Sequence, residues 1–260
     1  TRLAAPSTLV VGGPAALAVT VEHRLDCPAG SPFRINATPA ATGEELTFFL
    51  RSLNDAQRLL GDSGALTLEV VDERMPNVDL GGLARSGLIR LFLPRIREAS
   101  GEAAIFNGMV HEYFHTLQLA LIAGAGGSAD SFLFDPVWTH EAAANYFGHK
   151  LEKERYGTSL AAYQTAIRAL SLRTPATLAS LVRPSDIYNL PDFDARYATI
   201  ILAGFYLAAR DEEGLHTTVW VERGRTGNWQ VALSNTFGLT PAEFFADFER
   251  YRRTGVLANP

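Results

Sequence analysis

The sequence contains a single cysteine and no concentration of positive charge. One cysteine, Cys27, cannot form an intrachain disulfide, and a zinc site built from several thiolates is excluded as well. The 23 lysine and arginine residues are outnumbered by 28 aspartate and glutamate residues, which gives a formal net charge of −5. Proteins that bind nucleic acids carry a concentrated basic face. We therefore expect no nucleic-acid partner.

Long apolar runs are also lacking. The longest, ATIILAGFYLAA at residues 198–209, is too short for a bilayer-spanning helix, which needs about 20 residues. The apolar stretch at residues 9–19 is interrupted by Gly12, Gly13 and Pro14, which is not typical of a signal peptide. We expect no transmembrane segment, and the sequence is compatible with export as well as with a cytoplasmic location.

The composition that is present is that of an ordinary globular protein. Hydrophobic residues make up 47% and charged residues 20% of the 260 positions, and the length suits one large domain. No internal repeat or linker divides the chain. We expect a single α+β domain over residues 1–260, with a β-containing part at residues 1–100 and a mainly helical part at residues 101–260.

The local patterns support this division. Residues 42–64 predict a helix that begins with a Thr42–Glu45 capping box and ends near Gly61. Residues 65–73 and 86–94 predict strands. Further helices are expected at about 102–122, 135–156, 158–171, 175–182, 193–210, 214–223, 228–237 and 241–253.

The segment VHEYFHTLQ contains two histidines four positions apart, with a glutamate directly after the first. Residues at this spacing lie one turn apart on one face of a helix, so His111 and His115 can direct their imidazoles at one point. Two neutral imidazole nitrogens make up half of a tetrahedral zinc shell. Glu112 can reach a zinc-activated water without coordinating the metal, which is the arrangement of a general base.

The alternative is an amphipathic helix with incidental histidines. Val110, Phe114 and Leu117 make this helix apolar on most of its sides. Burying two histidines and a glutamate in such a helix is costly unless a partner satisfies them. The pattern therefore favours a metal site.

A catalytic zinc normally takes three protein ligands and leaves one position for water. The downstream candidates are His140, Glu141 and His149. The segment DPVWTHEAAANYFGHKL at residues 135–151 resembles the second ligand helix of the gluzincin metallopeptidases, which include thermolysin-like enzymes and alanyl-type aminopeptidases. The matching residues are Trp138, Glu141, Ala142, Ala144, Tyr146 and Phe147. The resemblance implies that Glu141 is the third zinc ligand.

Two neighbours of Glu141 have other expected roles. His140 would point about 100° away from Glu141 around the helix, so we expect it in a pocket wall or on the surface. Asn145 lies one turn after Glu141. The resemblance supports a hydrogen bond from the outer nitrogen of a ligand histidine to Asn145, which would fix the histidine tautomer; an exposed helix asparagine is the alternative.

Hydrolysis of a peptide also needs a donor for the oxyanion. Residues 194–207 resemble the gluzincin segment that carries a tyrosine for this purpose, with Tyr197 in the matching position and Tyr188 as a second candidate. Residues 227–251 resemble the closing helices of such domains. The resemblance thus covers about residues 86–253 and implies a zincin-like fold, with a small N-terminal sheet and a mainly helical C-terminal part.

One element of the alanyl-type aminopeptidases is missing. These enzymes carry a Gly-x-Met-Glu-Asn strand whose glutamate recognises the free amine of the substrate, and no such run occurs here. Residues 86–94 could form the edge strand that pairs with an extended substrate. Exopeptidase activity is therefore not implied.

These observations predict a zinc-dependent metallohydrolase, most simply a peptidase, that acts on a peptide or a small amide. Zn²⁺ would be held by His111, His115 and Glu141. One alternative is a zinc hydrolase of a non-peptide amide, an ester or a biosynthetic intermediate. Another is a degenerate zincin that only binds a partner, against which the intact Glu112 argues, because a binding module needs no general base.

Overall fold

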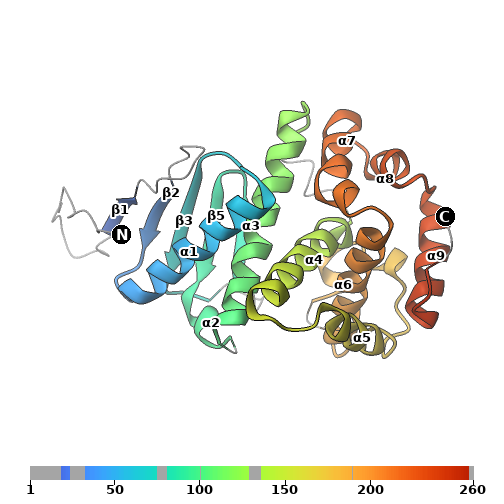
Figure 1. Cartoon of the computed structure of the whole chain (residues 1–260), viewed down its shortest axis with the longest axis horizontal. Coiled ribbons are helices and arrows are strands. Elements are labelled where there is room, and N and C mark those ends of the chain that lie inside the picture. Colours follow the sequence, from blue (N-terminus) through green and yellow to red (C-terminus); the bar gives the residue numbers. More distant parts are fainter. Residues whose placement is uncertain are drawn as a thin grey trace.

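The computed structural model describes residues 19–23, 33–74, 81–99, 101–128, 136–188 and 190–257; Cys27 lies outside these residues. The strands are β1 (Val19–His23), β2 (Phe33–Ala37), β3 (Leu66–Val71), β4 (Gly82–Arg85) and β5 (Leu88–Phe92). They form one mixed sheet in the order β1-β2-β3-β5-β4 (Figure 1). β2, β3 and β5 are parallel, whereas β1 and β4 pair antiparallel with β2 and β5.

Alternation along the strands and one amphipathic helix build the N-terminal core. In β3, Leu66, Leu68 and Val70 are buried and the residues between them are partly exposed, as the two-residue period of a strand requires. α1 (Gly43–Leu60) buries an apolar face that includes Phe49 and Leu53. The expected capping box begins this helix. Figure 1 shows α1 running across one face of the sheet.

α3 (Glu102–Gly124) is the long helix between the sheet and the other helices (Figure 1). It contacts β4, β5 and α1 as well as α4 and α7. Residues on several of its sides are buried, among them Phe106, Met109 and Phe114, so this helix has no single apolar stripe. Polar side chains in its middle therefore lie inside the molecule.

The C-terminal part is helical. Its elements are α4 (Val137–Tyr156), α5 (Leu160–Ser171), α6 (Phe193–Arg210), α7 (Val219–Thr226), α8 (Trp229–Phe237) and α9 (Pro241–Thr254), with the short turns η2 (Leu178–Ser180), η3 (Pro184–Asp186) and η4 (Gly214–Thr218). In the described part of the chain, none of the helices is both long and apolar enough for a membrane span.

A close helix crossing brings α6 onto α4. A Cβ atom at Gly204 would lie 2.1 Å from the carbonyl oxygen of Ala142, so only glycine permits this approach. Ala142, Ala143 and Ala144 are fully buried, and small side chains allow the two helices to pack closely. This crossing sets the distance between the residues that α4 and α6 contribute to the site.

Three expectations for the secondary structure need correction. The helix expected at residues 175–182 is only the 3₁₀ turn η2. The guanidinium of the buried Arg252 donates to the carbonyls of Ser171, Thr174 and Ala176, which satisfies these groups without a helix.

The other two corrections concern element boundaries. The segment expected as a helix at residues 214–223 begins as the π-helical turn η4 and continues as α7 to Thr226. The strand expected at residues 86–94 is shorter, because Leu93 and Pro94 begin the helix α2 (Leu93–Arg97). β4 was not expected at all, since a four-residue segment that begins with a glycine gives little strand signal.

Candidate metal centre

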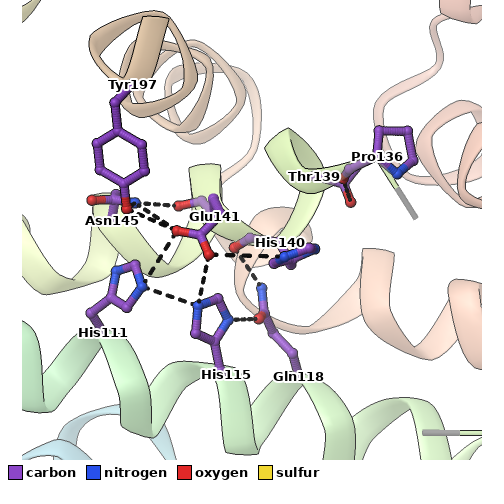
Figure 2. Close-up of polar contacts among 9 residues, drawn as sticks. All are labelled: His111, His115, Gln118, Pro136, Thr139, His140, Glu141, Asn145 and Tyr197. Atoms are coloured by element: carbon purple, nitrogen blue, oxygen red, sulfur yellow. Dashed lines mark hydrogen bonds and ion pairs between the residues drawn. The ribbon is translucent and has the colours of Figure 1, made fainter. Parts of the chain in front are cut away.

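The structure brings together one donor atom each from His111, His115 and Glu141. Figure 2 shows both imidazoles pointing from α3 toward the carboxylate on α4. The Nε2 atoms of the two histidines are 3.0 Å apart. Nε2 of His111 lies 3.5 Å from Glu141 Oε2, and Nε2 of His115 lies 3.6 Å from Glu141 Oε1.

These distances fit a zinc ion. Ligand atoms about 2.0–2.1 Å from a tetrahedral zinc are about 3.3–3.4 Å from one another. The three observed separations of 3.0, 3.5 and 3.6 Å lie on both sides of this value. Two imidazoles and a carboxylate are also a donor set that zinc accepts. His111, His115 and Glu141 therefore form a group that can hold a metal ion.

The local sequence explains how the donors meet. His111 and His115 are one turn apart on α3, and Glu141 lies in the second turn of α4. The start of α4 is anchored by a hydrogen bond from the Val137 amide to the Val182 carbonyl, 2.9 Å long. Its buried alanines then let it lie close to its neighbours, so the short Glu141 side chain reaches the histidines.

The protonation of the three groups follows from burial and mutual charge. Burial lowers the pKa of His111 to about 3, so its imidazole is neutral at pH 7. Burial would raise the pKa of Glu141, but the contact with His115 and the nearby histidines hold it well below its usual range. Burial alone would lower the pKa of His115. The contact with Glu141 acts in the opposite direction, and the net result is a pKa above the usual value.

Gln118, which the sequence reasoning missed, orients His115. Its Nε2 donates to the carbonyl of His140 at 3.2 Å, which directs its Oε1 to Nδ1 of His115 at 2.8 Å. An oxygen at that position requires a proton on Nδ1, so Nε2 is the nitrogen that His115 directs to the donor group. A polar residue one turn from His115 on an otherwise buried helix was the available signal.

Asn145, which was expected to serve a histidine, has other partners. Its Nδ2 donates to the carbonyl of Glu141 at 2.8 Å and to the hydroxyl of Tyr197 at 3.0 Å, and lies 3.5 Å from Glu141 Oε2. Asn145 thus forms hydrogen bonds with Glu141 and Tyr197, and not with the ring nitrogen of a histidine. Gln118 fills the expected role.

Tyr197 reaches the same carboxylate from α6. Its hydroxyl donates to Glu141 Oε2 at 2.8 Å (Figure 2). The ring of Tyr188 is 6.4 Å from that of Tyr197, and both residues line one cleft. Burial, and after it the charge of Glu141, raise the pKa of both tyrosines above the usual value. Both hydroxyls therefore keep their proton at neutral pH and can donate it in a hydrogen bond.

The remaining candidates divide into two environments. Glu112 lines the cleft, and burial raises its pKa to about 7. His140 also lines the cleft, with Nε2 3.9 Å from Glu141 Oε1, and burial lowers its pKa to about 4. His149 instead contacts Asn107, through Nδ1 at 2.8 Å, and the hydroxyl of Tyr163. Among the described residues, the group of converging donors includes neither His140 nor His149.

The cleft has a volume of about 640 Å³. β4, α3, the first turns of α4, residues 182–184 and the two tyrosines line it. The expectation that residues 86–94 form the edge strand is wrong, because β5 lies between β3 and β4. β4 is the edge strand on the cleft side.

The chain was compared with known proteins. Neither a protein-family model nor a curated protein sequence matches it. Its structure is similar to the crystal structure of a mutant M1 zinc metallopeptidase from Deinococcus radiodurans, with a TM-score of 0.51 and 18% sequence identity, over 88% of this chain and 50% of that one. The fold is zincin-like.

A second solved structure is less similar. It is a mutant two-domain M1 zinc metallopeptidase bound to L-arginine, with a TM-score of 0.47 and 13% identity, over 88% of this chain and 49% of the other. The chain thus spans about half the length of the solved structures that it matches. The similarity to the first of them, at 18% identity, shows the fold and not the activity.

Proposed function

We propose that the protein is a zinc-dependent peptidase of the gluzincin type, in which His111, His115 and Glu141 hold Zn²⁺. The observation that supports this most is the convergence of two imidazole nitrogens and one carboxylate at separations that suit a tetrahedral ion. When bound, zinc would polarise the scissile carbonyl and lower the pKa of water toward about 7. The single-domain organisation over residues 1–260 is part of this proposal.

The side chains around the donors have matching roles in the proposed reaction. Glu112 accepts a proton from the attacking water and returns it to the leaving amine. A pKa of about 7, raised by burial, suits a group that takes up and releases a proton near neutral pH. Tyr197 exchanges its hydrogen bond with Glu141 for one with the developing oxyanion. Asn145 orients Tyr197, and Gln118 orients His115.

The cleft supports an extended substrate. β4 is the edge strand on the cleft side, so it offers backbone groups to which a peptide could add as a further strand. Leu83 and Ala84 give this wall an apolar surface, and a cleft of about 640 Å³ is large enough for several side chains. These features favour a peptide over a compact amide or ester.

The decisive experiment is turnover of a fluorogenic peptide library by zinc-loaded protein and by its Glu112→Gln variant. The variant should retain one equivalent of zinc and lose activity by a factor of about 10²–10⁴, because only the proton transfer is removed. Glu102→Gln changes an exposed glutamate on the same helix and should be fully active. An active Glu112→Gln variant contradicts the mechanism, and a zinc-loaded wild type that cleaves no peptide contradicts the peptidase function.

A further inference from the structure

The backbone of β4 lies directly against the side chain of Glu112. A methyl group at Gly82 would lie 2.7 Å from Glu112 Cγ, 2.8 Å from Oε1 and 2.9 Å from Cδ. Carbon atoms do not approach one another this closely without displacement. The residue at position 82 therefore decides how much room the carboxyl group of Glu112 has.

We propose that Gly82 is a positioning residue for Glu112, and that its missing side chain is what lets the carboxyl group lie between α3 and the edge strand. The inference rests on the proposed function, because it assigns to the edge strand the task of holding the general base. It adds a steric requirement on β4 that neither the sequence pattern nor the donor group predicts.

The two sides of this contact differ in their freedom to move. β4 pairs antiparallel with β5 in the register Gly82↔Leu91, and the amide of Phe92 donates to the carbonyl of Gly81 at 3.0 Å. Leu91 is buried in the sheet, so the strand cannot retreat without disturbing the core. The Glu112 side chain, in contrast to the strand, can move by rotation about its Cβ–Cγ and Cγ–Cδ bonds. An added methyl group should therefore displace the carboxyl group and leave the strand in position.

Glu112 lines the cleft, so its carboxyl group can be displaced into the cleft. It follows His111 on α3 and precedes Tyr113, which is fully buried. A displaced carboxyl group would therefore move out of reach of the attacking water, while the two histidines and Glu141, which do not contact Gly82 in this way, stay in place.

The neighbouring glycine provides a matched control. A methyl group at Gly81 would lie 3.5 Å from Ile96 Cδ1 and 3.9 Å from Arg95 Cγ, which are ordinary contacts. Neither Gly81 nor Gly82 has a positive φ angle, so alanine suits the backbone at both positions. The same substitution at two adjacent residues thus differs mainly in whether it meets Glu112.

The test compares Gly82→Ala with Gly81→Ala in kinetics and in zinc content. Gly82→Ala should bind one equivalent of zinc with unchanged affinity and lower kcat by a factor of about 10²–10³, with KM changed less than about threefold, because a transition-state interaction is lost. Gly81→Ala should change kcat less than about threefold. A raised KM at unchanged kcat for Gly82→Ala would show that position 82 acts on substrate binding, which overturns the proposal.

A double-mutant cycle gives a second readout that needs no substrate. Gly82→Ala should lower Tm by several degrees when Glu112 is present, and by less than about one degree when Glu112 is already alanine, because the clash is then absent. If Gly82→Ala alone does not fold, recovery of the folded protein by adding Glu112→Ala supports the proposal, and failure of both overturns it. Equal Tm shifts in the two backgrounds would also overturn it.

The two readouts separate this inference from the proposed function. A wild-type protein that cleaves no peptide contradicts the proposed function. The Tm cycle would still show whether a side chain at position 82 clashes with Glu112. An active wild type with a fully active Gly82→Ala variant and no coupling in Tm contradicts the role of Gly82 and leaves the function standing.

Discussion

At the scale of single residues, the site is defined by hydrogen bonds that orient polar groups in a buried setting. Gln118 fixes the tautomer of His115, and Asn145 connects Glu141 with Tyr197. Each of these amides is buried, and each uses its donors on a carbonyl or a hydroxyl. Such partners hold donor atoms in position before a metal binds, which reduces the cost of forming the site.

The two tyrosines of the cleft can be distinguished by their contacts. Tyr197 donates to Glu141, whereas Tyr188 lines the cleft beside it. Tyr197→Phe should lower kcat on a cleaved peptide by a factor of about 10²–10³, the usual loss for one oxyanion donor, while Tyr188→Phe lowers it less than about tenfold. The zinc content of each variant should be measured as a control, because a disturbed Glu141 would also lower activity through loss of zinc. A larger loss in Tyr188→Phe would assign the donor to Tyr188.

At the scale of secondary-structure elements, the ends of α1 and α2 are tied together. Glu45 accepts two hydrogen bonds from Arg97 at 2.8 and 3.0 Å, and one from the Thr42 amide at 2.7 Å. The contact with Arg97, joined by the bond from Thr42, lowers the pKa of Glu45 to about 2. Arg97 also donates to the carbonyl of Ala40, so α2 is attached to the segment before α1.

This arrangement predicts a pH-dependent contribution to stability. The pKa of Glu45 in the folded state, about 2, is below its usual value of 4.5, so the stabilisation is present above about pH 4.5 and is lost as the pH falls toward 2. Glu45→Gln should therefore lower Tm by roughly 1–4 °C at pH 7. The difference from wild type should shrink as the pH falls from 5 toward 3.

The neighbouring glutamate provides the control for this measurement, which thermal unfolding followed by circular dichroism can make. Glu44 is exposed in the same helical turn, and Glu44→Gln should leave the slope of Tm against pH below pH 5 unchanged. A Glu45→Gln variant with the same pH slope as the wild type would show that the Arg97 contact is not formed in solution.

At the scale of the whole molecule, α3 joins the two halves of the structure. It carries apolar residues toward the sheet and toward the helices, and the donor group lies where α3 meets α4 (Figure 1). The cleft extends from that group between the edge strand β4 and the helical part. A metal ion held by His111, His115 and Glu141 would therefore link α3, which packs against the sheet, to α4 in the helical part.

Zinc removal should accordingly destabilise the folded protein. A ligand that binds only the native state at about 1,000 times its Kd adds about 4 kcal/mol, which corresponds to roughly 10 °C in Tm for a chain of this size. The measurement is Tm by differential scanning fluorimetry with excess zinc and after chelation. Magnesium should produce no such shift.

Three alanine variants control this prediction. His111→Ala and Glu141→Ala should abolish both the stoichiometric zinc and the Tm shift. His149→Ala removes a partly buried histidine outside the donor group and should retain the shift. Zinc that stays bound to Glu141→Ala would move the third ligand to another residue.

The sequence alone determined what depends on neighbours along the chain. The capping box of α1, the alternation in β3 and the common face of His111 and His115 follow from geometry within one or two turns. Most of the helices could be predicted for the same reason. Where packing overrode local preference, the prediction was wrong, as at residues 175–182, where the distant Arg252 takes the carbonyls that a helix would use.

Only the tertiary structure decided which distant groups meet. Three residues on α4 could have supplied a donor, and the phase and approach of that helix bring the Glu141 carboxylate to the histidines. The same holds for Gln118 beside His115, for β4 as the edge of the cleft, and for Gly82 against Glu112. These contacts join segments far apart in the chain, so they depend on how whole elements pack and not on local spacing.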